Sequence, residues 1–140
     1  MSIYVSADKS LLDIPFVHNF LTNSYWSDSI SEEIVRKSIE HSLCFGIYEE
    51  SKQIGFARVI TDYSTFAYLA DVFIDAERSG QGHGKTLVGY IMSHPDLQQI
   101  KRWHLVTRDA QGLYQQFGFE QLEYTDQHME ITNPNIFKQS

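Results

Sequence analysis

The sequence predicts an α/β (α+β) fold built around a mixed sheet, and three observations lead to this prediction. Short aromatic and β-branched runs alternate with amphipathic stretches of helical length. Three strand-like runs follow one another in the middle of the chain with short polar connections, which favours an antiparallel meander. The third run leads through a glycine-rich turn and a helix to another strand, which is typical of a parallel crossover. The expected order is β-α-α-β-β-β-α-β-α-β-β in a single domain, residues 1–140.

The first half of the chain is expected to form one short strand, two helices and the meander. Residues 3–5 are the short strand, and Asp13 is expected to cap the first helix. Ser29 and Glu32 have the spacing of a capping box, which predicts that the second helix begins there and ends near residue 41. The three strands of the meander are expected at residues 43–48, 54–60 and 66–74.

The second half is expected to complete the sheet and cover it. Pro95 forbids continuation of the helix that follows the glycine-rich turn, and Gly118 ends the last helix. The tail, residues 133–140, is expected to be loose. An exposed final strand pair could join a sheet across a homodimer. The elements expected here are a helix at 81–93, a strand at 103–107, a helix at 110–117 and strands at 119–124 and 128–131.

Composition excludes several classes of protein. Aromatic residues make up 14% of the 140 residues, which argues against disorder. The net charge of −7 disfavours binding to nucleic acid or an anionic membrane, because both need a basic surface. The single cysteine, Cys44, excludes an internal disulfide, and the six histidines show no metal-ligand spacing. With no signal-peptide pattern and no apolar run near 18 residues, the expected location is cytoplasmic.

The segment from Asp71 to Val88, DVFIDAERSGQGHGKTLV, carries the most chemical information. Gly80, Gly82 and Gly84 lie between a strand and a helix. Glycines there allow backbone angles closed to other residues and leave the main-chain amides open to a ligand. A helix N-terminus also carries about half a positive charge, so this turn predicts a phosphate or diphosphate site.

Two common phosphate-binding motifs fit this turn poorly. The dinucleotide fingerprint needs G-x-G-x-x-G, whereas the glycines here alternate. The P-loop needs G-x-x-x-x-G-K-[ST]; Gly84, Lys85 and Thr86 match its end, but Ser79 stands at its first glycine. Because the end of the P-loop motif is matched, a small nucleotide-binding protein of the P-loop type is kept as a less favoured alternative.

Two segments resemble the GCN5-related N-acetyltransferase (GNAT) superfamily. Residues 79–84, SGQGHG, resemble its loop [QR]-x-x-G-x-[GA], with both glycine positions matched, Ser79 in place of the leading Gln or Arg, and Arg78 one place earlier. Residues 109–119, DAQGLYQQFGF, resemble its second motif, in which a tyrosine lies near the coenzyme sulfur. The order of elements over nearly the whole chain agrees with this family.

The resemblance implies that acetyl-coenzyme A lies in a splay between the strands at 66–74 and 103–107, with its diphosphate on the glycine loop. It also implies that Tyr114 returns a proton to the thiolate. The proton of the amine could go, directly or through water, to Asp71, where the family often places an acid, or to Asp62 or Tyr63 at the preceding turn, and the amine could also arrive already neutral. The residues expected to bind the cofactor are Val72, Phe73, Ile74, Arg78, Ser79, Gly80, Gln81, Gly82, His83, Gly84, Lys85 and Asp109.

The acceptor is expected to bind between the loop that joins the first two helices and the turn before residue 66. Tyr25 and Trp26 offer aromatic faces that suit a cationic amine, and Asp62 and Tyr63 lie at that turn. The implied function is acetyl transfer from acetyl-coenzyme A to a small-molecule or protein amine, by direct attack in a ternary complex and without a metal. A coenzyme-binding sensor of the same fold, without transfer, is the alternative that the Ser79 departure motivates.

Overall fold

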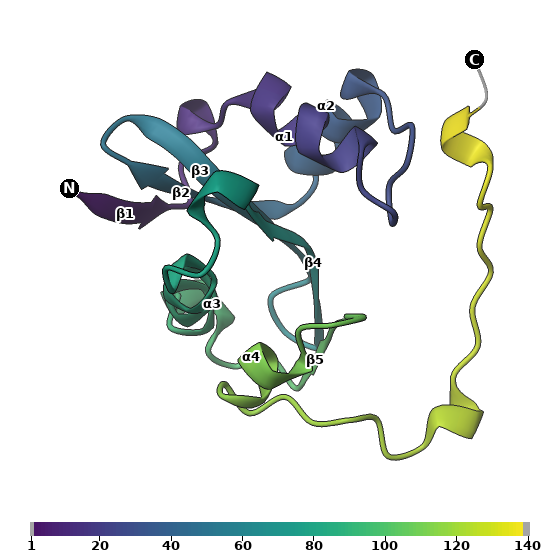
Figure 1. The fold of residues 1–140 in the computed structure, drawn as a ribbon. Coiled ribbons are helices and arrows are strands. Elements are labelled where there is room, and N and C mark those ends of the chain that lie inside the picture. The colour runs from purple at the N-terminus through teal and green to yellow at the C-terminus, as the bar shows by residue number, and fades with distance from the viewer. Residues whose placement is uncertain (1, 139–140) are drawn as a thin grey trace.

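The computed structural model describes residues 2–138, and its five strands form one sheet in the order β1-β2-β3-β4-β5 (Figure 1). Neighbouring strands are antiparallel except β4 and β5, which are parallel. This confirms the predicted mixed fold with its central meander. The strands are β1 (Ile3–Ser6), β2 (Leu43–Glu49), β3 (Lys52–Thr61), β4 (Phe66–Ile74) and β5 (Arg102–His104).

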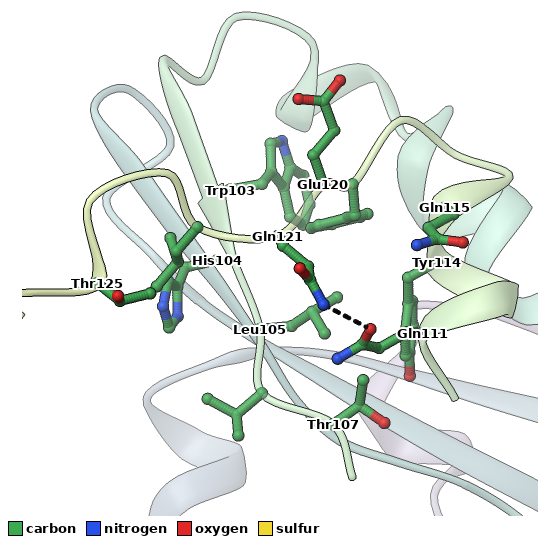
Figure 2. Close-up of a pocket in the computed structure, with 13 residues that line it drawn as sticks. Trp103, His104, Leu105, Thr107, Gln111, Tyr114, Gln115, Glu120, Gln121 and Thr125 are labelled. Atoms are coloured by element: carbon green, nitrogen blue, oxygen red, sulfur yellow. Dashed lines mark hydrogen bonds between the residues drawn. The ribbon is translucent and has the colours of Figure 1, made fainter. Parts of the chain in front are cut away.

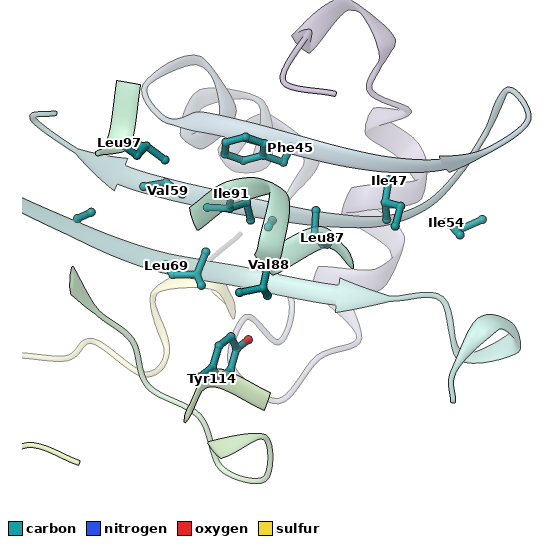
Figure 3. Packing of buried hydrophobic residues seen from close by; sticks show 12 residues of the cluster. Phe45, Ile47, Ile54, Val59, Leu69, Leu87, Val88, Ile91, Leu97 and Tyr114 are labelled. Atoms are coloured by element: carbon teal, nitrogen blue, oxygen red, sulfur yellow. The ribbon is translucent and has the colours of Figure 1, made fainter. Parts of the chain in front are cut away.

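Helices cover both faces of the sheet because side chains alternate between the two faces along each strand. On one face α1 (Ile14–Thr22) and α2 (Glu32–Glu40) bury Val17, Leu21, Val35 and Ile39 against Phe56 and Phe73. On the other face α3 (His83–Met92) and α4 (Gln111–Gln115) pack on β2, β3 and β4 (Figure 3). The buried side chains on that face include Phe45, Ile47, Val59, Leu69, Leu87, Val88, Ile91 and Tyr114.

The two N-terminal helices begin at side-chain caps, one of which the sequence placed wrongly. Asp13 Oδ1 accepts a hydrogen bond from the backbone N–H of Phe16, as predicted. The cap of α2 is Ser31, whose hydroxyl accepts from the N–H of Ile34, and Ser29 instead has a positive φ of 72°. The chain is still turning at Ser29, so the helix begins two residues later than the capping-box spacing predicted.

The predicted C-terminal strand pair is wrong. Residues 119–124 and 128–131 form no strand, and a 3-10 turn at Thr125–Gln127 separates them. Strands need a hydrogen-bonded neighbour, but within residues 2–138 the N–H groups of residues 129–135 donate no hydrogen bond. Every residue from 120 to 136 is exposed, and this segment is called the arm below. Its first residues line a cavity beside β5 and α4, and the His128 ring stacks on that of His104 at a centroid distance of 6.3 Å. The later residues of the arm run apart from the body of the molecule (Figure 1).

The two residues that follow the arm contact the body, unlike the predicted loose tail. Phe137 is half-buried against the cluster formed by α1 and α2, and Lys138 Nζ lies 3.6 Å from Asp28 Oδ2. Residues 139 and 140 of that predicted tail lie outside the described residues.

The parallel strands β4 and β5 separate part of the way along. Their pairing covers Phe66–Tyr68 against Arg102–His104, and β4 then continues to Ile74 without β5 beside it. A register shift opposite β3 and a positive φ of 55° at Asp71 mark a bulge in β4 just beyond this point. The edge of β4 that faces away from β3 is therefore open over its last residues.

Candidate functional site

A cleft of about 510 Å³ opens where β4 and β5 diverge. Residues 68–72 of β4 form one wall, and residues 105–107, which continue β5, form the other. Residues 25–27 close one end, and α4 contributes Tyr114. The sequence-predicted site residues that the structure brings to this cleft are Tyr25, Trp26, Asp71, Val72, Asp109 and Tyr114.

The glycine-rich turn lies between the end of β4 and the start of α3, and its backbone amides are its distinguishing feature. Gly80 and Gly82 have φ angles of 77° and 82°, which favour glycine, and a methyl group on either would meet no atom within 4 Å. Gly82 is the N-cap of α3. Within residues 2–138, the backbone N–H groups of residues 80–85 have no hydrogen-bond acceptor. Open space, bare amides and the positive end of α3 together favour an anion at this turn.

The side chains of this turn contribute less than its main chain. Ser79, Gln81 and Lys85 are exposed, and His83 is buried with Nε2 3.2 Å from Gln81 Oε1. Arg78, predicted to bind the cofactor, places Nη2 2.8 Å from Glu49 Oε1 at the end of β2. The guanidinium of Arg78 therefore fixes the segment before the glycines to the sheet.

Tyr114 combines a buried ring with a position on the cleft wall. Only 7% of the residue is exposed, and its ring packs edge-on against Phe119. Burial, together with the nearby Asp109 carboxylate, raises the pKa of Tyr114 to about 12. The hydroxyl group therefore keeps its proton throughout the neutral range and can donate it.

Both carboxylate oxygens of Asp71 are engaged. Oδ1 accepts a hydrogen bond from Trp26 Nε1 at 2.8 Å, and Oδ2 accepts one from Arg58 Nε at 2.9 Å. Arg58 also donates from Nη1 to the hydroxyl of Ser42. Asp71 thus joins the loop between α1 and α2 to the bulge in β4. Each oxygen keeps a second lone pair that can accept from a water molecule.

Sequence reasoning missed Arg58, Arg108 and Phe137. Arg58 was visible as a lone charged residue in an otherwise apolar strand, and its side chain is only 17% exposed. Arg108 places Cζ 3.6 Å from the centre of the Tyr25 ring, a cation–π contact across the mouth of the cleft. Phe137 also lines the cleft, although no local signal links the end of the chain to it.

Asp62 and Tyr63, predicted to bind substrate, are not among the residues that line the cleft. They lie in the turn between β3 and β4, where Tyr63 has a positive φ of 65°. Hydrogen bonds from the hydroxyl and N–H of Thr65 and the N–H groups of Ser64 and Phe66 hold the pKa of Asp62 well below its usual range. In this structure the Asp62 carboxylate organises the turn.

A second cavity, of about 440 Å³, lies between the continuation of β5, α4 and the first part of the arm (Figure 2). Gln111 and Gln121 interact across it, with Nε2 of Gln121 3.3 Å from Oε1 of Gln111. Leu105, Val106, Thr107 and Tyr114 line this cavity as well as the cleft. These four residues therefore separate the two spaces.

This fold and site define an α/β domain in which a turn with open backbone amides lies beside an open strand edge. The family model for the acetyltransferase (GNAT) domain matches residues 40–121, which is more than half of the chain. The chain therefore belongs to the GNAT acetyltransferase family, a class of acyl-transferring enzymes.

Similar proteins agree with this assignment. A crystal structure of an acetyltransferase assigned to the GNAT family from Xanthomonas campestris is 43% identical, covers 99% of each chain and superposes with a TM-score of 0.94. A protein of Gibberella zeae, provisionally named as an acetyltransferase, is 29% identical over 133 residues, covering 79% of this chain and 74% of that protein. An acetyltransferase of Clostridium acetobutylicum, solved with acetyl-CoA, shares the fold at 14% identity and a TM-score of 0.67 over 94% of this chain and 96% of that one.

No helix within residues 2–138 is long and apolar enough to cross a membrane. The same part of the chain contains no group of three His, Cys, Asp or Glu residues placed to hold a metal ion.

Proposed function

We propose that the protein transfers an acetyl group from acetyl-CoA to a primary amine by direct attack in a ternary complex. The observation that carries this proposal is the row of bare amides at residues 80–85, which opens beyond the free edge of β4. Coenzyme A, in which a diphosphate is joined to the amide-rich pantetheine chain, needs both features in this order.

The proposed binding mode follows from the backbone groups that are left open. The diphosphate accepts hydrogen bonds from the amides of residues 80–85, and the exposed Lys85 ammonium stands beside it. The pantetheine amides pair with the free edge of β4 at Val72, Phe73 and Ile74, as an added strand would. Asp109, on the cleft wall, faces the reactive end of this chain.

The proposed chemistry uses a neutral amine and the thioester. The amine nitrogen attacks the carbonyl carbon, an N–H near Phe73 stabilises the negative oxygen, and the C–S bond then breaks. Tyr114 donates its hydroxyl proton to the departing thiolate, and the amine loses a proton to Asp71 through water. The raised pKa of Tyr114, about 12, keeps this proton on the phenol until the thiolate departs.

The acceptor is proposed to enter past Tyr25 and Trp26. These rings, the Asp71 carboxylate and the Arg108–Tyr25 contact surround the mouth of the cleft. A small amine and an amine on a protein both fit this description. Asp62 and Tyr63 lie outside the lining and are proposed to act on the acceptor only through the shape of the β3–β4 turn.

Calorimetric titration with acetyl-CoA tests the proposal. We expect saturable binding, and we expect ATP with magnesium to bind far more weakly. Absence of binding at about 1 mM acetyl-CoA would contradict the proposal. A dissociation constant above that concentration corresponds to a binding free energy weaker than about −4 kcal/mol. Tight binding of ATP with magnesium would favour a P-loop function instead. A panel of amines with thiol release as the readout separates transfer from coenzyme sensing, because a sensor binds the coenzyme and releases no thiol.

A further inference from the structure

The mouth of the cleft carries a guanidinium group that no carboxylate of the described chain neutralises. Arg108 places Cζ 3.6 Å from the centre of the Tyr25 ring, and both residues are exposed. Thr107 and Asp109, its neighbours along the chain, both line the cleft, so Arg108 stands at the cleft rim. Within residues 2–138 the ion pairs join other cations to carboxylates, and Arg108 takes part in none. Its N–H donors are therefore left for water or for a ligand.

This guanidinium is held in place from two sides. The Tyr25 ring restrains the group but gives its N–H donors no lone pair. That ring is itself supported, because it meets the ring of Trp26 edge-on at a centroid distance of 5.1 Å and the Trp26 indole donates to a carboxylate of β4. The hydroxyl of Thr107 accepts from the N–H of Ala110 at 3.1 Å and fixes the loop that carries Arg108. A restrained guanidinium loses less entropy when it binds an anion.

Beside Tyr114 the available charge has the opposite sign. Asp109 lines the cleft and forms no ion pair in the described part of the chain. Its carboxylate lies close enough to Tyr114 to contribute to the raised pKa of that phenol. Arg58, the cation among the lining residues, is engaged, with Nε on Asp71 and Nη1 on a serine hydroxyl. The cleft thus offers an unpaired carboxylate near Tyr114 and an unpaired guanidinium at its rim.

These opposite charges indicate an acceptor that carries both signs. A primary alkyl amine in water is largely an ammonium ion at neutral pH, so a carboxylate near the reacting end favours its approach. The Tyr25 face already holds the cation of Arg108, so a second ammonium group on the acceptor would meet a like charge at the rim. A carboxylate at the same place would instead accept two parallel hydrogen bonds from the guanidinium.

We propose that the acceptor is a small primary amine whose far end carries a carboxylate, and that Arg108 is the specificity-determining residue that binds this carboxylate. The inference rests on the proposed acetyl transfer and names the class of its acceptor. A chain with a net charge of −7 would by itself attract polyamines, and the cation at the rim acts against them. In this arrangement the Tyr25 ring holds Arg108 and does not receive the amine.

Acceptors that are matched in length and differ in charge test the proposal. β-Alanine, γ-aminobutyrate and ε-aminocaproate are each compared with the monoamine and the diamine of the same chain length, with thiol release from acetyl-CoA as the readout. We expect kcat/KM to be at least about tenfold higher for the amino acid than for the monoamine, as for a charge-assisted hydrogen bond, and lowest for the diamine. Added salt should reduce this preference, because it screens an exposed ion pair.

Variants of Arg108 assign the preference to this side chain. Arg108→Gln should bring the ratio of the two kcat/KM values close to one, whereas Arg108→Lys, which keeps the charge without the planar fork, should retain part of the preference. Each ratio is taken within one variant, so a partial loss of folded protein cancels. Arg36→Gln removes an exposed arginine of α2 that does not line the cleft, and this matched control should keep the wild-type ratio.

The outcomes separate this inference from the transfer on which it rests. No preference for the amino acids, or a preference that Arg108→Gln leaves unchanged, would overturn the inference while acetyl transfer stands. Coenzyme binding without thiol release from any of these amines would overturn the inference and favour the coenzyme sensor instead.

Discussion

The Tyr114 hydroxyl is the group on which the proposed proton return depends. Tyr114→Phe removes this oxygen and keeps the ring that packs in the core. We expect kcat to fall by about 10²- to 10⁴-fold, the usual contribution of a positioned acid. The KM for acetyl-CoA should change little. Steady-state thiol release measures both, and an unchanged unfolding midpoint confirms that the fold is intact. An unchanged kcat, with chemistry shown to limit the rate, would remove Tyr114 from the mechanism.

The pH profile provides a second test of the same residue. The folded-state pKa of about 12 lies above the ordinary value of about 10. Tyr114 therefore keeps its proton as pH rises to 10 and loses it only near 12. No basic limb below pH 10 should arise from this group. A loss of kcat centred near pH 9 in the wild type, absent from Tyr114→Phe, would contradict the raised pKa of Tyr114 while leaving its role as the acid in place.

Asp71 is proposed to take the amine proton through water while it holds Trp26 in place. Asp71→Asn keeps the shape and abolishes the basicity, so we expect kcat to fall about 100-fold or more. Trp26→Phe removes the indole N–H and leaves the carboxylate, so the main effect should be a higher KM for the acceptor. Steady-state kinetics with one acceptor separates these outcomes. Equal KM effects and an unchanged kcat in both variants would leave Asp71 as a positioning residue only.

The turn between β4 and α3 is an element in which backbone geometry is proposed to determine function. Gly82→Ala places a methyl group in open space but forces alanine to a φ of 82°. The strained backbone should reorient the neighbouring amides. We therefore expect coenzyme affinity to fall at least about tenfold, which is about 1.4 kcal/mol of binding free energy. Gly112→Ala, also with open space but no positive φ, is the control and should bind normally. Equal affinity of both variants by calorimetry would contradict the amide cradle.

The pairing of β3 with β4 depends on a close approach at Gly55. A Cβ atom there would lie 2.7 Å from the carbonyl oxygen of Phe73 and as close to side chains of Ile47 and Ile74. Gly55→Ala should therefore lower the free energy of unfolding by about 1–3 kcal/mol, as overpacking does. Gly89→Ala in α3, where the nearest atom is 3.6 Å away, should be neutral or stabilising. Urea denaturation measures both variants, and equal stability would show that β4 shifts freely.

At the scale of the whole molecule, local patterns determined what the sequence could predict. The bounds of β4 and the glycine turn follow from neighbouring residues, so the sequence predicts both. The network of Trp26, Asp71 and Arg58 joins residues 45 and 13 positions apart, and no local pattern reveals it. The arm looked like a strand pair because its apolar residues alternate. Alternation predicts an extended chain, whereas pairing depends on a partner at the right distance.

The amides of residues 80–85 allow the most direct test of the central claim. Two-dimensional ¹H–¹⁵N spectra, recorded while acetyl-CoA is added, follow each N–H group of this turn individually. We predict saturable shifts at residues 80–85 from the diphosphate and at residues 72–74 from the pantetheine chain. Spectra in which these amides do not move, while the coenzyme binds elsewhere or fails to bind at all, would contradict the account.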